Sequence, residues 1–338
     1  MEIRRVLDIP RLRNIPLSAT PFTQKLMGYL VLWPNFRFPP KVEISFENFD
    51  RVPNEAVIFA MNHTDRYNYW PFQFQMWQQY GRFTSTWVKG KYYENPAIGK
   101  FMQLTNNLPT VSRGYLITRD FLSVMKRAPN NDEYAALRNW VDATSLGPGG
   151  DTPELAPEVT DKLFGQARDV FGHPFDPSRE TYPVYVNSIF RIMMELFVAL
   201  NQQARDLGLD ILIFPQGTRS VRLIRGHIGL AELAMKFQAT VVPVGCSGAD
   251  LVYPGSSPIG QRGKIVYRIG EPIPHKEMER FHVPSDFTPF DAMHEAEHRD
   301  KLQGYVDVVM DRINELVDPQ YQYGDEAAPI EDGERRFV

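Results

Sequence analysis

The chain has 338 residues, of which 43% are hydrophobic and 23% are charged, and its formal net charge is −4. This length allows one large domain or two small ones with a substantial core, and the charge argues against a large nucleic-acid surface. The single cysteine, Cys246, excludes an intramolecular disulfide and a multi-cysteine zinc site, and its apolar setting indicates a buried strand rather than a catalytic thiol.

Residues 1–40 are basic and interrupted by prolines. No secretory signal is evident there. The apolar run from Leu26 to Trp33 ends at Pro34, and we expect that neither this run nor any other has the roughly 20 apolar residues that a membrane span needs. Basic residues precede the run, and Trp33 and Phe36 suit the headgroup level of a bilayer. The run therefore predicts either a short core helix or a helix that lies in a membrane interface.

Four apolar runs predict strands that are buried on both faces. They lie at residues 56–61, 211–214, 240–244 and 264–269. Helical patterns separate them, at about 71–79, 184–207 and 230–237. Strands that alternate with helices predict an α/β fold with a mixed, mostly parallel sheet flanked by helices. The apolar face of the 184–207 helix suits a core helix better than an acyl tunnel.

Residues 129–183 differ from their surroundings, because they contain Gly147-Pro148-Gly149-Gly150, further prolines and many acidic groups. We predict an inserted helical lobe there, with short helices at about 132–144 and 160–170. A long helix is predicted at 289–317. The acidic tail, residues 318–338, has no periodicity, which predicts an extended or disordered segment. The expected organisation is an N-terminal membrane-associating segment at 1–40, a main domain at 41–317 that carries the lobe, and the tail.

Four short blocks carry side chains suited to chemistry. In chain order they are Asn62-His63-Thr64-Asp65-Arg66-Tyr67-Asn68, Leu108-Pro109-Thr110-Val111-Ser112-Arg113-Gly114, Phe214-Pro215-Gln216-Gly217-Thr218-Arg219-Ser220 and Val242-Pro243-Val244. A histidine after a buried strand suits a general base, because its unperturbed pKa lies near neutral pH. A group two or five residues later can return to its other ring nitrogen. The turn after the second strand offers backbone N–H groups and a guanidinium, which suit a phosphate.

In order and content the blocks resemble the lysophosphatidate and glycerol-3-phosphate acyltransferase family, whose first block is N-H-x4-D and whose third is F-P-E-G-T-R-S. The resemblance covers about residues 40–280. It implies a glycerolipid acyltransferase-like fold at 41–317 and transfer of an acyl group from acyl-CoA or acyl-carrier protein to a hydroxyl, as in phospholipid biosynthesis. The implied acceptor is a lysophospholipid such as 1-acylglycerol 3-phosphate. No metal, bound cofactor or nucleic acid is implied, and the protein would sit on the cytoplasmic side of a membrane as a peripheral or monotopic protein.

By the same resemblance His63 is the base, and Asn68 or Asp65 orients it. The implied substrate- and phosphate-binding residues are Arg113, Gln216, Gly217, Thr218 and Arg219, with Lys89 and Lys91 as weaker candidates. The chain departs from the family at two carboxylates, which are Asn68 and Gln216 here. An asparagine can orient an imidazole but cannot stabilise the imidazolium, and an Asp-to-Asn change in this role costs a serine protease about 10⁴ in turnover. Either Asp65 compensates, or the chemistry or acceptor differs, or activity is lost.

Three other functions stay open: acyl transfer to a non-lipid acceptor such as a specialised metabolite or peptide, hydrolysis of the thioester, and non-catalytic lipid binding. A separate motif, His294-Glu295-Ala296-Glu297-His298, matches the H-E-x-x-H pattern of zinc metalloproteases. Its surroundings are polar and no third ligand follows, so a solvated helix face is the better interpretation.

Overall fold

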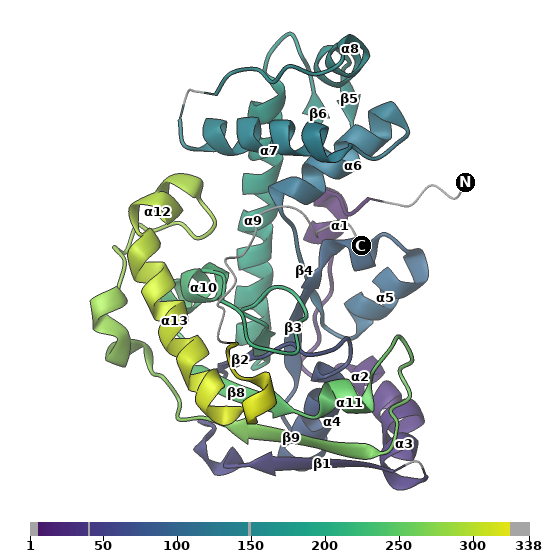
Figure 1. Cartoon of the computed structure of the whole chain (residues 1–338), viewed down its shortest axis with the longest axis vertical. Helices are drawn as coiled ribbons and strands as arrows, with labels where there is room; N and C mark the ends of the chain where they lie inside the picture. The colour runs from purple at the N-terminus through teal and green to yellow at the C-terminus, as the bar shows by residue number, and fades with distance from the viewer. Residues whose placement is uncertain (1–5, 40, 148–149, 325–338) are drawn as a thin grey trace.

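A computed structural model of the chain describes residues 6–39, 41–147 and 150–324. Their main feature is a seven-stranded sheet in the order β1-β9-β8-β2-β7-β3-β4, with helices on both faces and a small lobe at one end (Figure 1). The strands are β1 (Val42–Glu47), β2 (Ile58–Met61), β3 (Thr84–Lys89), β4 (Leu108–Thr110), β7 (Asp210–Ile213), β8 (Val241–Ser247) and β9 (Gly263–Ile269). The predicted fold class, a mixed and mostly parallel sheet flanked by helices, is confirmed.

The centre of the sheet is parallel. β8, β2, β7, β3 and β4 run in one direction, whereas β9 is antiparallel to β8 and carries β1 parallel to itself at the edge. The carboxyl ends of the parallel strands therefore meet along one edge of the sheet, where α/β proteins commonly bind their ligands. The first and third sequence blocks follow the ends of β2 and β7, and the second contains β4 and the start of α6.

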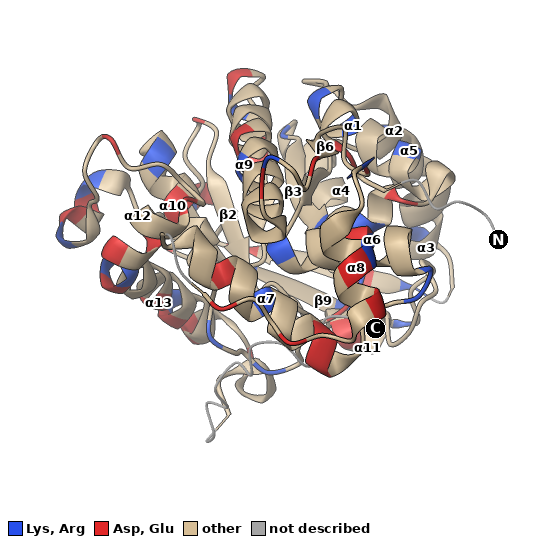
Figure 2. Ribbon diagram, turned by 90° about the horizontal axis from the view of Figure 1, so that it is seen from above, with Lys and Arg blue, Asp and Glu red and all other residues tan. Residues whose placement is uncertain are grey.

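Helices surround the sheet on both sides (Figure 1). They are α1 (Ile9–Arg13), α2 (Phe22–Met27), α3 (Trp33–Arg37), α4 (Tyr69–Tyr80), α5 (Pro96–Leu104), α6 (Arg113–Met125), α7 (Asn131–Ser145), α8 (Pro157–Gly165), α9 (Tyr182–Asp206), α10 (Gly229–Phe237), α11 (Ala249–Val252), α12 (Ala292–Glu297) and α13 (Arg299–Leu316). Seen from above, Lys, Arg, Asp and Glu lie largely on these outer helices, with both signs along α13 (Figure 2).

Alternate residues of β2 pack against two different helical layers. Ile58 and Ala60 belong to the core formed with α10 and α13, whereas Phe59 and Met61 belong to the core formed with α3 and α4. All four side chains are fully buried. Burial on both faces explains why this strand is continuously apolar in the sequence and why its position could be predicted.

The inserted lobe consists of α7, α8 and a hairpin of β5 (Arg168–Asp169) and β6 (Pro174–Phe175), joined to the sheet by α6 and α9 (Figure 1). The predicted helix at 160–170 is displaced, since α8 ends at Gly165 and the chain turns into β5. A buried ion pair fastens the hairpin: Arg168 Nη2 lies 2.5 Å from Asp120 Oδ2 on α6, and the guanidinium covers the ring of Phe175 at 4.7 Å.

Asp120→Ala is expected to lower the free energy of unfolding by about 3–5 kcal/mol, because it leaves the buried Arg168 without its counter-charge. Urea unfolding followed by circular dichroism measures the change. Glu158→Ala is the control, since Glu158 pairs with Lys162 on the exposed face of α8; that substitution should leave the free energy of unfolding nearly unchanged, because solvent screens an exposed pair. Equal effects of the two substitutions would contradict the role of the buried pair.

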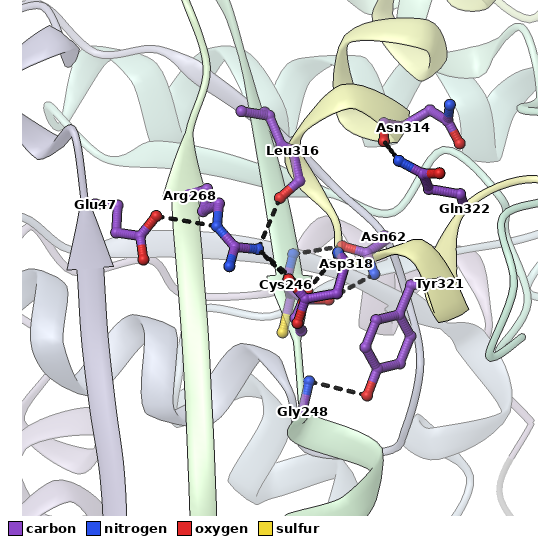
Figure 3. A network of polar contacts seen from close by, with 11 residues as sticks. Glu47, Asn62, Cys246, Gly248, Arg268, Asn314, Leu316, Asp318, Tyr321 and Gln322 are labelled. Carbon is purple, nitrogen blue, oxygen red and sulfur yellow. Dashed lines mark hydrogen bonds and ion pairs between the residues drawn. The ribbon is translucent and has the colours of Figure 1, made fainter.

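The C-terminal region differs from the prediction in two ways. The predicted helix at 289–317 is broken at His298 into α12 and α13, and Asp291 caps the start of α12. Residues 318–324, predicted to be extended or disordered, instead contain a 3-10 turn at Pro319–Tyr321. The Tyr321 side chain is buried, and its hydroxyl accepts from Gly248 N at 3.0 Å (Figure 3). Arg268 of β9 binds Glu47, the Leu316 carbonyl and Asp318 in the same network. The remainder of the predicted tail, 325–338, lies outside the described residues.

Two apolar helical segments are relevant to membrane association. In the N-terminal segment, α2, a π-helical turn (Gly28–Leu32) and α3 follow one another; Leu32 and Phe36 are buried, but several large apolar side chains are exposed. The second segment is α9, which by length and composition could cross a membrane. This differs from the prediction that no stretch is long and apolar enough to do so. Its buried residues pack into the core with α7, and a core helix passes the same test.

Candidate active site

The loop after β2 is anchored by Asn62, which is buried. Its side-chain amide donates to the Cys246 carbonyl at 2.9 Å and accepts from the Cys246 amide at 2.7 Å (Figure 3). This reciprocal pair ties the end of β2 to β8 where backbone pairing stops. The backbone of the next residue, His63, therefore leaves the sheet at a fixed position.

The imidazole of His63 is held by Asn68. The ring Nδ1 lies 3.1 Å from Asn68 Oδ1, and Asn68 Nδ2 donates to the Asn62 carbonyl at 2.9 Å. Because the amide nitrogen is committed to that carbonyl, the amide oxygen faces the ring, and Nδ1 must carry the hydrogen. The neutral ring then has its lone pair on Nε2. Asn68 thus selects the tautomer that can accept a proton at Nε2.

The surroundings of His63 favour the neutral ring. Burial is the main cause that lowers the pKa of His63, to about 3; the Asn68 hydrogen bond opposes this effect, and the positive charges of Arg219 and Lys89 add to it. The ring is stacked on Phe214, with centroids 4.0 Å apart. No carboxylate contributes to this pKa, so the site differs from a histidine that is paired with an aspartate.

Asp65 does not contact His63. Its Oδ1 accepts from the Tyr67 amide at 2.7 Å, and its Oδ2 accepts from the Thr64 hydroxyl at 3.0 Å. Burial raises the pKa of Asp65 to about 6. The carboxylate therefore closes the turn that presents the histidine, and of the two predicted orienting residues the structure brings only Asn68 to the ring.

The third block is fastened to the backbone of His63 from both sides. Gln216 Oε1 accepts from the His63 amide at 3.2 Å, and the Ser220 amide donates to the His63 carbonyl at 2.9 Å. Gln216 is fully buried, so it supports the loop rather than presenting a group to solvent. Gly217 has a φ of 64°, and a Cβ there would lie 2.9 Å from the His227 ring. The turn that presents Thr218 and Arg219 thus requires glycine.

Arg219 and Lys89 are the cations that act on His63. Thr218 and Arg219 are exposed at the turn after β7, and Lys89 is the last residue of β3. The sequence ranks Lys89 below Arg113 because β3 itself is not recognisable there as a strand. Lys89 lies at the carboxyl end of a parallel strand, a position that favours a ligand-binding role.

Arg113 is placed elsewhere. It is the first residue of α6, its Nε donates to Asn187 Oδ1 of α9 at 2.7 Å, and its guanidinium covers the ring of Phe190 at 4.1 Å. It lines a cavity to which none of the other predicted site residues contributes. The contacts of the described residues therefore divide the predicted set into two groups, one around His63 and one around Arg113.

The H-E-x-x-H motif spans the break between α12 and α13. His294 Nδ1 accepts from the Thr288 amide at 2.9 Å, and the His298 ring lies beside Phe287. The described residues contain no group of three or more His, Cys, Asp or Glu side chains that could hold a metal ion.

No protein-family model matches the chain, and no curated protein matches it in sequence. Among solved structures, the 1-acyl-sn-glycerophosphate (LPA) acyltransferase PlsC from Thermotoga maritima is similar at a TM-score of 0.35 and 13% sequence identity, over 88% of this chain and 79% of that chain. So distant a likeness carries no weight for activity. The fold and site define an α/β protein with a histidine–asparagine pair at the carboxyl edge of its sheet.

Proposed function

We propose that the chain is an O-acyltransferase that moves an acyl group from acyl-CoA or acyl-carrier protein to a hydroxyl. The observation that carries the proposal is the Nε2 lone pair of His63, which Asn68 leaves available at the carboxyl edge. Nε2 takes the proton from the acceptor hydroxyl while its oxygen attacks the thioester carbonyl. The C–O bond forms, the C–S bond breaks, and the proton passes from Nε2 to the departing thiolate. No metal or bound cofactor is needed for this scheme.

The acceptor that we propose is a lysophospholipid such as 1-acylglycerol 3-phosphate. Its phosphate is anionic, and Arg219 and Lys89 place positive charge near His63. Thr218, exposed on the Gly217 turn, adds a hydroxyl donor of the kind that phosphates bind. The four sequence blocks support the same assignment.

We also propose that the protein acts at a membrane surface, on the cytoplasmic side, as a peripheral or monotopic protein. Exposed apolar side chains gather on the N-terminal helices: Phe22, Leu26, Tyr29, Leu30 and Phe38, which are 72%, 40%, 54%, 67% and 58% exposed. Basic side chains on the same segment suit anionic headgroups. A helix with one buried and one exposed apolar face can lie in an interface while it remains attached to the domain.

The double substitution Tyr29→Glu with Leu30→Glu is expected to reduce binding to anionic phospholipid vesicles by tenfold or more, because it places two charges in the apolar layer (about 1 kcal/mol or more each). Cosedimentation with the vesicles measures binding. Met293→Glu, an exposed apolar residue of α12, is the control and should change nothing. Equal binding by the double variant would show that another surface contacts the membrane.

A mass-spectrometric transfer assay tests the proposed reaction. Purified protein receives long-chain acyl-CoA or acyl-carrier protein, with and without lysophosphatidate, beside His63→Ala. New diacyl product that disappears in the variant is the expected result. Thioester loss without that product indicates hydrolysis or a non-lipid acceptor, and an intact thioester in every reaction contradicts the proposal in favour of a binding protein.

A further inference from the structure

A cavity of about 610 Å³ lies between α7, the first half of α9 and the segment 288–292. This volume is within the range of small-molecule binding sites. The residues that line it include Arg113 and Lys236, but none of the residues around His63. The cavity is therefore a place where a ligand can bind without using the proposed catalytic group.

The Arg113 guanidinium at the cavity wall is fixed in orientation. Its Nε donates to Asn187 Oδ1, and Asn187 Nδ2 in turn donates to the Val141 carbonyl of α7 at 2.8 Å. One face of the guanidinium covers Phe190. Among the described residues no carboxylate forms an ion pair with it, although Asp142, Asp291, Glu295 and Glu232 interact electrostatically with its charge. A half-buried cation is thus held in place without a direct ion-pair partner.

The acidic residues that line the cavity are already engaged. Glu195 pairs with Arg191 at 3.2 Å on α9. Asp291 accepts from the amides of Met293 and His294 at the start of α12. With the Arg191–Glu195 pair set aside, Arg113 and Lys236 remain against Asp291, so the formal charge of the lining is +1.

The rest of the wall is apolar, and part of it is strained. Val184, Phe190, Met194, Val198 and Phe290 line the cavity. Phe290 has a φ of 64°, which is unfavourable for an aromatic residue, and the buried Glu232 holds it there by accepting from its amide at 2.7 Å. Strain of this kind persists where the surrounding structure requires it, often beside a ligand.

We propose that this cavity binds an amphipathic organic anion, with its charged group on Arg113 and its apolar part along Phe190, Met194 and Val198. A neutral ligand would leave the guanidinium desolvated without a counter-charge, and a cationic ligand would be repelled. A small inorganic anion would leave the apolar wall empty. The site is separate from the His63 site, and the inference does not rest on the proposed acyl transfer.

Calorimetric titration with dodecanoate, and in parallel with dodecyl phosphate, tests the site. Both probes are long-chain anions, and the tighter one identifies the preferred head group. Arg113→Met keeps the apolar stem and is expected to weaken binding about 10- to 100-fold, since it removes a charge-assisted contact. Arg179→Met removes an exposed arginine of the lobe and serves as the matched control with unchanged affinity. Dodecyltrimethylammonium should not bind.

Val198→Trp is a second variant that fills the cavity without altering its charge, and it should abolish binding of both anions. His63→Ala should leave their affinities unchanged, so the outcome is independent of whether the chain transfers acyl groups. Wild-type affinity in a folded Arg113→Met variant overturns the proposal, as does the absence of binding to the wild type. Loss of binding in His63→Ala would place the anion at the His63 site and overturn it as well.

Discussion

His63→Ala is expected to lower turnover by a factor of about 10²–10⁴, the usual contribution of a positioned general base. The loss should fall on kcat rather than on KM, because Nε2 acts on the proton that moves in the transition state and not on the bound acyl chain. Alanine also removes the ring that covers Phe214. The thermal midpoint of each variant must therefore be measured beside the initial rates of diacyl product.

His173→Ala is the matched control, because it removes a histidine from the lobe, where the ring lies beside Tyr185. Its turnover should equal that of the wild type. A fully active His63→Ala enzyme would eliminate the assignment of the base and leave the Asn68 contact as a structural feature of the loop. A rate that falls in both variants would indicate general destabilisation instead.

The central strands could be predicted from the sequence, but β3 could not, and the difference is physical. Thr84, Ser85 and Thr86 of β3 are fully buried yet polar. Gln73 donates to the hydroxyls of Thr84 and Thr86 at 2.7 and 3.0 Å, so α4 satisfies groups that look solvent-facing in the sequence. Because hydrophobic periodicity is the main signal for a strand, the sequence does not predict β3, nor that Lys89 lies at a strand end.

The sequence indicates which polar residues follow β2 but not which of them contact one another. The sequence allows Asp65 or Asn68 to return to His63, since either spacing can form a turn. The choice depends on Asn62, whose carbonyl takes the Asn68 amide while its own side chain is bound to β8. The contact between the Asn62 side chain and Cys246 of β8 joins residues far apart in the chain, so no local sequence pattern contains it.

The position of Arg113 depends on the inserted lobe in the same way. Ser112 caps α6 and turns the chain away from the sheet, and Asn187, beyond the insertion, binds the guanidinium. The resemblance implies that Arg113 binds the phosphate together with Arg219, whereas in the structure Arg113 contacts Asn187 of α9. The resemblance could therefore identify the residue as an anion-binding candidate without locating the anion.

Asn68→Asp is expected to raise turnover at neutral pH, by tenfold or more if the aspartate acts as it does in serine proteases. The substitution places a carboxylate beside Nδ1 of His63, where it stabilises the imidazolium that forms during the reaction. It also removes the amide that donates to the Asn62 carbonyl and puts a second oxygen against it. We therefore expect a lower thermal midpoint together with the higher rate.

The pH dependence separates this electrostatic effect from a structural one. With a His63 pKa of about 3, the wild-type base is deprotonated throughout the range from pH 5 to 8, and kcat/KM should not fall as the pH decreases through it. A carboxylate beside the ring raises the pKa of His63. The kcat/KM of Asn68→Asp should therefore decrease when the pH drops below this higher pKa. Asp65→Asn, which removes a carboxylate that does not contact the ring, should keep the wild-type profile. If Asn68→Asp instead loses activity equally at every pH while folded, the amide has a role in the reaction that a carboxylate cannot replace.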